Sequence, residues 1–323
     1  MSFQPQVRKA QRLACKASIM LEGLTGTGKS GTALLIAYYL AGENWDKVGH
    51  IDTENRSADL FVNTPCSNGK IFDQFLVCSL DKIVGFSPSN FLIAKDALLE
   101  AGALAIVKDS ISHSWQYDGG ILDIVNKAKT KNAHYSKDKY AVWGDPEVMR
   151  EKLNLMSLIR DPNAHIITTV RVKEKMEYST DDEGKTIIKS LGDQQIQQAD
   201  LKYEPDLVLH TISPGANEDG KITHPRVRVV KSRYAIFRKD EEYDLTPKIL
   251  RQLKAYLEEG ADPVVLLEQQ RQDYIKAVTE YLDTNKSAVA IWTVLKKDAG
   301  FENTKLTDMP LDILKKLYVT LLN

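Results

Sequence analysis

The chain has few of the residues that build disulfide frameworks or metal centres. Its three cysteines, Cys15, Cys66 and Cys78, show no C-x-x-C spacing and are odd in number, so we expect reduced thiols. The six histidines are scattered along the 323 residues without metal-ligand spacing. A zinc site is therefore not expected.

Long apolar segments and a surplus of one charge are also missing. No apolar run approaches the roughly 20 residues that span a bilayer, and the N-terminus lacks the apolar stretch of a signal peptide. We therefore expect no membrane contact and a cytoplasmic protein. The 43 basic side chains are balanced by 44 acidic ones. Any nucleic-acid contact must then use a local patch rather than a basic field of the whole protein.

The length and composition suit one large α/β domain and a smaller one. Apolar residues make up 43% of the chain, which is enough for a substantial core. We divide the chain into a polar N-terminal arm at 1–16, an α/β core at 17–259 and a small all-helical domain at 264–323. The arm is either a surface lead-in to the first strand or a contact to a neighbouring subunit.

A glycine-rich segment between a strand pattern and a helix pattern is the most specific motif. It spans 23–30 with the form G-x-x-x-x-G-K-S, after an apolar run at 17–21 and before another at 32–40. Glycines let backbone N–H groups approach phosphate oxygens, and a helix N-terminus favours anions. Lys29 is expected to reach the β- and γ-phosphates of a nucleoside triphosphate, and the Ser30 hydroxyl to bind Mg²⁺. The residues of this phosphate loop expected to bind the nucleotide are Gly23, Thr25, Gly26, Thr27, Gly28, Lys29, Ser30 and Gly31.

Two further predicted strands end in acidic residues. The pattern at 47–54 ends in Asp52 and Glu54, and the pattern at 103–110 ends in Asp109. Because the carboxyl ends of parallel strands face the ligand crevice, we expect these carboxylates near the γ-phosphate. A carboxylate after the first strand could orient or deprotonate water, or it could be a solvent-facing acid. Asp109 has the position of a Mg²⁺-organising aspartate, although a lysine directly before it interrupts the apolar pattern.

Aromatic and basic residues gather between His113 and Trp143. The aromatic residues are Trp115, Tyr117, Tyr135, Tyr140 and Trp143, and the basic ones are Lys127, Lys129, Lys131, Lys137 and Lys139. Such a mixture suits single-stranded DNA, since bases stack on rings and lysines neutralise phosphates. The alternative is a helical insertion that packs its aromatic residues inward. A hairpin predicted at 173–191 carries more lysines, but its acidic turn at 181–184 argues against a strongly cationic loop.

The rest of the chain shows alternating strand and helix patterns, followed by helices alone. Strands are expected at 75–80, 164–170, 206–212 and 225–231, and helices at 90–102, 145–160 and 246–259. From 264 to 323 the periodicity is only helical, in three segments interrupted near Asn285 and at 302–304.

In this order the parts resemble the core of RecA recombinases, and more narrowly RecA-like ATPases encoded by phages. The resemblance covers about residues 12–258. It is carried by the phosphate loop, Ile51-Asp52-Thr53-Glu54, Asp109-Ser110-Ile111-Ser112-His113-Ser114-Trp115, Val142-Trp143-Gly144-Asp145, Ile166-Ile167-Thr168-Thr169-Val170-Arg171, Tyr203-Glu204-Pro205-Asp206 and Val229-Val230-Lys231-Ser232-Arg233.

The resemblance implies roles for individual residues. Glu54 matches the catalytic glutamate, and Asp109 matches the aspartate on the Mg²⁺ side. Thr169 stands where RecA has a glutamine that senses the γ-phosphate, so the resemblance places Thr169 among the nucleotide-binding residues. The departure from glutamine leaves open how the nucleotide state reaches the DNA-binding loop. Lys231 and Arg233 match paired cations that reach a neighbouring subunit's γ-phosphate like arginine fingers, which implies a ring or a filament. The alternative for this pair is a solvated strand end.

The function implied is an ATP- and Mg²⁺-dependent ATPase that binds single-stranded DNA in phage recombination, annealing or replication. Its two DNA-binding loops would be the insertion at 113–143 and the hairpin region at 173–198. The segment at 264–323 lies outside the resemblance and could dock DNA, dock a recombination or replication partner, or act as a structural cap. Two alternatives stay open: a nucleotide-gated interaction protein with little turnover, and a small-molecule kinase on the same loop. For a phage-encoded protein the cytoplasm is the host's.

Overall fold

The computed structural model describes residues 9–66, 69–132, 134–135, 138, 140–180, 186–212 and 224–322. The chain divides into two compact units. One contains residues 16–257, and the other combines the residues before 16 with those after 257.

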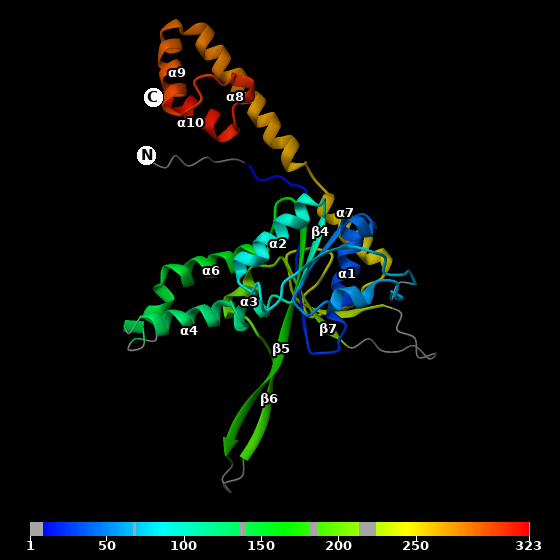
Figure 1. Cartoon of the computed structure of the whole chain (residues 1–323). Helices are drawn as coiled ribbons and strands as arrows, with labels where there is room; N and C mark the ends of the chain where they lie inside the picture. Colours follow the sequence, from blue (N-terminus) through cyan, green and yellow to red (C-terminus); the bar gives the residue numbers. More distant parts are fainter. Residues whose placement is uncertain are drawn as a thin grey trace. The chain divides into compact units, whose positions relative to one another are not determined.

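The larger unit is built on one twisted sheet, which Figure 1 shows between two groups of helices. Its strands are β1 (Ser18–Gly23), β2 (Val48–Asp52), β3 (Leu76–Ser79), β4 (Ala105–Asp109), β5 (His165–Thr180), β6 (Thr186–Gln195), β7 (Leu207–Ile212), β8 (Arg226–Ser232) and β9 (Glu242–Asp244). Their order is β3-β2-β4-β5-β1-β7-β8-β9, with β6 paired to β5 outside this path. In this order the six strands β3, β2, β4, β5, β1 and β7 run parallel to one another, while β8 and β9 each pair antiparallel with the preceding strand. The predicted α/β fold with a mostly parallel sheet is confirmed.

Helices cover both faces of the sheet and enclose two cores. They are α1 (Lys29–Leu40), α2 (Pro88–Glu100), α3 (His113–Gln116), α4 (Ile121–Lys131), α6 (Pro146–Ser157) and α7 (Pro247–Glu258). Ile19 and Leu21 of β1 face the core under α1 and α7, whereas Met20 faces the core under α2, α4 and α6. Buried parallel strands contact apolar groups on both sides, which explains why β1 and β4 appear in the sequence as mostly apolar runs. In β2 the buried residues include His50 and Asp52.

Strand β5 is longer than the sequence pattern predicts. It pairs in parallel with β1 from Ile166 to Arg171, and it then pairs with β6 from Val172 to Thr180. The predicted hairpin is therefore confirmed, but its first strand is a continuation of the strand expected at 164–170. We call this extension, together with β6, the β5–β6 ribbon (Figure 1). The predicted turn at 181–184 lies outside the described residues.

The smaller unit is helical, as predicted. Its helices are α8 (Pro263–Thr284), α9 (Lys286–Asp298) and α10 (Leu311–Leu322), around a core that includes Val278, Trp292, Met309 and Leu314. The described end of the N-terminal arm belongs to this unit, since Ala14 N donates a 3.0 Å hydrogen bond to Ala261 O. None of the described helices is both long and apolar enough to cross a membrane.

Candidate nucleotide site

The phosphate loop connects the end of β1 to the start of α1. Gly26 and Gly28 have φ angles of +84° and +80°, which side chains other than glycine rarely adopt. A Cβ atom on Gly23 would lie only 2.2 Å from Thr211 Oγ1 on β7. The glycines are therefore required by the path of the loop, independently of any ligand.

Hydroxyl and ammonium groups hold this loop in place. Thr27 Oγ1 lies 2.6 Å from Thr211 Oγ1, within hydrogen-bond distance, and also donates to Leu24 O at 2.9 Å. Lys29 Nζ donates hydrogen bonds to Gly23 O at 3.0 Å and to Leu24 O at 2.8 Å. The ammonium of Lys29 thus lies over the loop itself.

The charges around Lys29 come from three different strands or strand ends. Burial lowers the pKa of Lys29, the charges of Asp109 and Glu54 raise it, and the charge of Arg171 lowers it. These three side chains therefore lie within electrostatic range of the phosphate loop. The strand register supports this proximity, because Arg171, which binds Glu54, pairs with Gly23 of the loop. In addition, Thr53 N donates a 3.0 Å hydrogen bond to Asp109 O. The charges of Glu54 and Asp109 thus act on Lys29, although the sequence places the three residues 25 to 80 positions apart.

The other predicted loop residues differ in their surroundings. Thr25 is exposed, and Ser30 is half-buried in the first turn of α1. A Cβ atom on Gly31 would approach the Phe61 ring to 3.3 Å, so this glycine allows close packing against α1. The nucleotide contacts of these three residues stay predictions.

The two acidic residues at the end of β2 have different environments. Asp52 is buried, and its carboxylate accepts hydrogen bonds from Glu54 N at 2.7 Å and from Ala58 N at 3.0 Å. It therefore fixes the turn after β2. Glu54 is half-buried, and its Oε1 accepts a hydrogen bond from Arg171 Nη2 at 2.7 Å. Asp52 is thus bound by backbone N–H groups of the turn, whereas Glu54 is bound by a guanidinium and is partly exposed. The catalytic role of Glu54 stays a prediction.

Asp109 ends β4, between the strands that carry Asp52 and Thr169. One carboxylate oxygen of Asp109 accepts a hydrogen bond from Thr169 Oγ1, and the other lies 4.0 Å from His50 Nε2. His50 is fully buried, and this burial lowers its pKa although the charge of Asp109 raises it. The carboxylate is thus oriented by its neighbours, as expected for a group that organises a hydrated cation.

Thr169 is fully buried and forms hydrogen bonds with the residues at the end of β4. Besides the hydroxyl contact to Asp109, the Thr169 carbonyl accepts hydrogen bonds from Ser110 Oγ and Ile111 N, both at 3.1 Å. These contacts make Thr169 a support for the end of β4. Its assignment to nucleotide binding stays a prediction.

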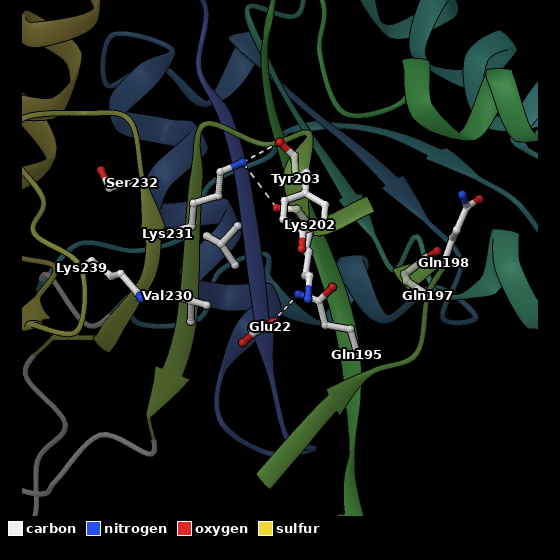
Figure 2. A pocket seen from close by; sticks show the side chains of 11 residues that line it. Glu22, Gln195, Gln197, Gln198, Lys202, Tyr203, Val230, Lys231, Ser232 and Lys239 are labelled. Carbon is white, nitrogen blue, oxygen red and sulfur yellow. Dashed lines mark hydrogen bonds between the residues drawn. The ribbon is translucent and has the colours of Figure 1, made fainter. Parts of the chain in front are cut away.

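Lys231 and Arg233 lie at the end of β8 and bind oxygens of their own chain. Lys231 Nζ donates a hydrogen bond to Tyr203 O at 2.6 Å (Figure 2). It also donates one to Pro205 O at 2.7 Å. Arg233 Nη1 donates to Asp206 Oδ1 at 2.9 Å. Burial lowers the pKa of Lys231, and the charge of Arg233 lowers it further. Within one chain Arg233 is therefore paired with a carboxylate, whereas the described hydrogen-bond partners of Lys231 are neutral carbonyls.

A cavity of about 770 Å³ opens beside Lys231. Its floor includes Glu22 of β1, which accepts a hydrogen bond from Gln195 at the end of β6 (Figure 2). Lys202 and Lys239 also line it. The lysines outnumber the single carboxylate, and the cavity is therefore suited to an anionic group.

Sequence reasoning missed the groups that surround Glu54. Besides its contact to Glu54, Arg171 donates a hydrogen bond from Nη1 to Tyr117 OH at 3.1 Å. The Tyr117 ring packs against His113 with 4.3 Å between centroids, and His113 Nδ1 lies 2.6 Å from Thr53 Oγ1. The available signal was the charge of Arg171 directly after a run of buried β-branched residues.

The aromatic and basic segment predicted to contact DNA is largely a packed insertion. Trp115, Tyr135 and Trp143 pack against the core under α2, α4 and α6, whereas Tyr140 is 84% exposed. Lys127 forms an ion pair with an aspartate one turn earlier on α4. Of the two alternatives, a helical insertion that packs its aromatic residues inward therefore describes Trp115, Tyr135 and Trp143 better than a DNA-binding surface does. Lys137 and Lys139 lie outside the described residues.

One part of this insertion still offers an aromatic surface. The rings of Trp115 and Trp143 stack with 6.4 Å between centroids, and Lys152 lies over the Trp143 ring. Together with Gln198 they line a second cavity of about 250 Å³. An aromatic pair with an adjacent cation can receive a base and its phosphate.

A protein cage for a metal ion is missing from the described part of the chain. No three carboxylate, histidine or cysteine side chains gather there as metal ligands. Mg²⁺ needs no such cage, because it keeps several waters and binds through one or two protein oxygens and substrate phosphates. The Ser30 hydroxyl and the Asp109 carboxylate are oxygen ligands of the right kind, so these residues fit Mg²⁺.

Neither a scan against models of known protein families nor a search of curated proteins gives a match for this chain.

Proposed function

We propose that the chain is a RecA-type ATPase that hydrolyses ATP with Mg²⁺ and acts on single-stranded DNA as an oligomer. The observation that carries the ATPase proposal is the meeting of Lys29, Glu54 and Asp109 beside a glycine loop that leads into a helix. Phosphoryl transfer depends on positioning and charge neutralisation more than on covalent chemistry. Side chains of these three types supply both.

Each side chain has a distinct role in the proposal. The loop N–H groups and Lys29 bind the β- and γ-phosphates, and Lys29 exchanges its two carbonyl partners for phosphate oxygens. When bound, Mg²⁺ neutralises phosphate charge, with Ser30 and Asp109 as its protein ligands. Glu54 orients the attacking water and accepts its proton.

The strand order supports the RecA type in one respect. Because β5 lies between β1 and β4, it runs between the phosphate loop and Asp109. A side chain on β5 can therefore contact the nucleotide, and the same strand continues into the β5–β6 ribbon. This ribbon occupies the place in the chain where the resemblance puts a DNA-binding loop.

The proposed oligomer depends on Lys231 and Arg233. In the single chain both bind oxygens of the 203–206 segment. A neighbour's triphosphate offers Lys231 an anionic acceptor in place of neutral carbonyls, and the attraction between opposite charges then adds to the hydrogen bond. The cavity beside Lys231 gives such a phosphate room to enter. Hydrolysis then needs two copies of the chain.

The proposed contact to single-stranded DNA is supported by two surfaces. The first is the stacked pair of Trp115 and Trp143 with Lys152, and the second is the larger cavity with Lys202 and Lys239. Gln198 lines both the smaller cavity beside the tryptophan pair and the larger cavity beside Lys231, so the two cavities lie next to each other. Aromatic platforms beside lysines bind single strands with little sequence preference.

A second candidate is a nucleotide-gated interaction protein with little turnover. It is favoured by the hydrogen bond of 2.7 Å between Arg171 and Glu54. A carboxylate held by a guanidinium is not free to accept a proton from water. In this candidate the pair persists with ATP bound, and nucleotide binding alone changes the partners of the chain.

The first experiment measures ATP turnover with and without single-stranded DNA, and mass in solution with a non-hydrolysable ATP analogue. Lys29→Ala is expected to abolish turnover, because it removes the loop cation. The matched control is Lys248→Ala, which removes an exposed lysine of α7 outside the site and is expected to keep turnover unchanged. Retained turnover in Lys29→Ala would reject the site.

The second experiment tests whether neighbours share a site. Glu54→Gln and Lys231→Ala are each expected to be inactive alone. An equal mixture should recover about a quarter of wild-type turnover, because random assembly places an intact Glu54 beside an intact Lys231 in about one interface of four. DNA-independent turnover by a monomer would remove the recombinase proposal and keep the ATP site. Nucleotide-dependent assembly without turnover would favour the second candidate.

A further inference from the structure

The face of β5 next to the phosphate loop carries one cation that the resemblance does not assign. Side chains two positions apart on a strand point to the same face, so Arg171 shares the face of Thr169. Its Cα pairs with that of Gly23, the first glycine of the loop. Because Thr169 is buried against Asp109, Arg171 is the next side chain along β5 that can reach a bound phosphate.

Arg171 is well positioned by its own chain. Its backbone N–H donates a hydrogen bond to Ser112 Oγ at 3.0 Å, and its guanidinium binds Glu54 Oε1 at 2.7 Å and Tyr117 OH at 3.1 Å. The side chains of Arg171 and Glu54 are each 33% exposed, so solvent and ligands can reach the pair. The two side-chain contacts use two of the five N–H donors of a guanidinium, which leaves donors for an oxyanion.

The charges favour an anion next to Arg171. Burial lowers the pKa of Lys29, the charges of Asp109 and Glu54 raise it, and the charge of Arg171 lowers it by a smaller amount, so Lys29 and Arg171 are close enough to repel each other. A phosphate group between them relieves this repulsion. A half-exposed ion pair such as Arg171–Glu54 adds little to stability, so stability alone does not account for the arrangement.

We propose that Arg171 binds the γ-phosphate of ATP held by its own phosphate loop, and that it leaves Glu54 when it does so. The inference deepens the proposed ATPase and rests on it. With ATP bound, Glu54 is released and accepts a proton from the attacking water. With ADP bound, Arg171 has no γ-phosphate to bind and stays on Glu54. Arg171 thereby takes the sensing role that the resemblance gives to a glutamine at the position of Thr169.

The test compares the affinity for two fluorescent nucleotides, mant-AMPPNP and mant-ADP, in the presence of Mg²⁺. Arg171→Ala is expected to weaken mant-AMPPNP binding by about 10- to 100-fold, the loss of a charged hydrogen bond, and to leave mant-ADP binding unchanged. Arg171→Gln, which keeps a polar side chain without the charge, is a second variant in case the alanine variant unfolds. The matched control is Arg251→Ala, which breaks the ion pair with Glu43 outside the loop and should change neither affinity.

Each outcome separates the inference from the proposed function. Loss of the preference for mant-AMPPNP in both Arg171 variants supports the inference. A retained preference with reduced turnover overturns it and leaves the ATPase in place, since Arg171 then only orients Glu54. A wild-type protein that binds both nucleotides equally also overturns the inference, and one that binds neither overturns the ATPase as well.

Discussion

Replacing Lys108 with methionine should stabilise the protein at neutral pH and remove part of its pH dependence. Lys108 precedes Asp109 on β4 and is fully buried, with its Nζ donating a 2.5 Å hydrogen bond to Leu158 O. Burial lowers the pKa of Lys108 to about 7, and the charge of Lys95 also lowers it, against a raising effect of Asp161. The folded state therefore disfavours the ammonium form.

The sign of the effect follows from proton binding. The pKa of Lys108 is about 7 in the folded protein and 10.5 in its ordinary state, so between these values the unfolded chain binds more protons. Stability therefore rises with pH across this window. The cost of burying Lys108 is about 4 kcal/mol at pH 7.5 and about 2 kcal/mol at pH 9, taking about 1.4 kcal/mol per pKa unit. Methionine avoids this cost but leaves the Leu158 carbonyl without its partner, at about 1–3 kcal/mol.

The assay is urea unfolding followed by tryptophan fluorescence at pH 7.5 and pH 9. The wild-type free energy of unfolding should rise by about 2 kcal/mol between these pH values, and that of Lys108→Met should not. Burial raises the pKa of the Cys66 thiol to about 12, which opposes the rise only above about pH 9. A wild-type stability that is flat or falls between pH 7.5 and 9 would refute the reasoning.

Two further predictions concern the phosphate loop and acid stability. Gly23→Ala places a Cβ atom 2.2 Å from Thr211 Oγ1 and should lower the free energy of unfolding by about 1–3 kcal/mol. Urea titration measures this, and adding Thr211→Ala should recover part of the loss. Burial lowers the pKa of His165 to about 3, so the unfolded chain binds more protons below pH 6.5 and stability falls as the pH decreases. At pH 5 this loss should be about 2 kcal/mol, and thermal unfolding of His165→Gln should show less of it.

Features determined by local patterns could be predicted from the sequence. The phosphate loop was found because glycine, lysine and serine spacing fixes its backbone path within eight residues. The buried strands β1 and β4 are predictable because both of their faces contact apolar groups, which makes their sequences mostly apolar. Even Lys108 did not obscure β4, since its long apolar stem can lie in the core while its ammonium finds a carbonyl.

Contacts between distant residues could not be predicted in the same way. Arg171 and Glu54 lie 117 positions apart, and no local pattern pairs them. The residue spacing after β2 also does not distinguish a catalytic carboxylate from a solvent-facing acid, because it does not show that the Asp52 carboxylate caps the following turn. For Lys231 the sequence indicates a cation at a strand end, whereas its carbonyl partners at 203–205 come from another part of the chain.

The continuity of β5 has a mechanical consequence. From Ile166 to Thr168 the strand pairs with both β1 and β4, from Thr169 to Arg171 it pairs with β1, and from Val172 to Thr180 it pairs with β6. At about 3.3 Å per residue the segment at 172–180 extends roughly 30 Å from the sheet. A tilt of about 5° at its base would therefore displace its far end by about 3 Å. Arg171 lies at this base, directly before the residues that pair with β6. A small adjustment at Arg171 would therefore become a larger displacement at the far end of the ribbon.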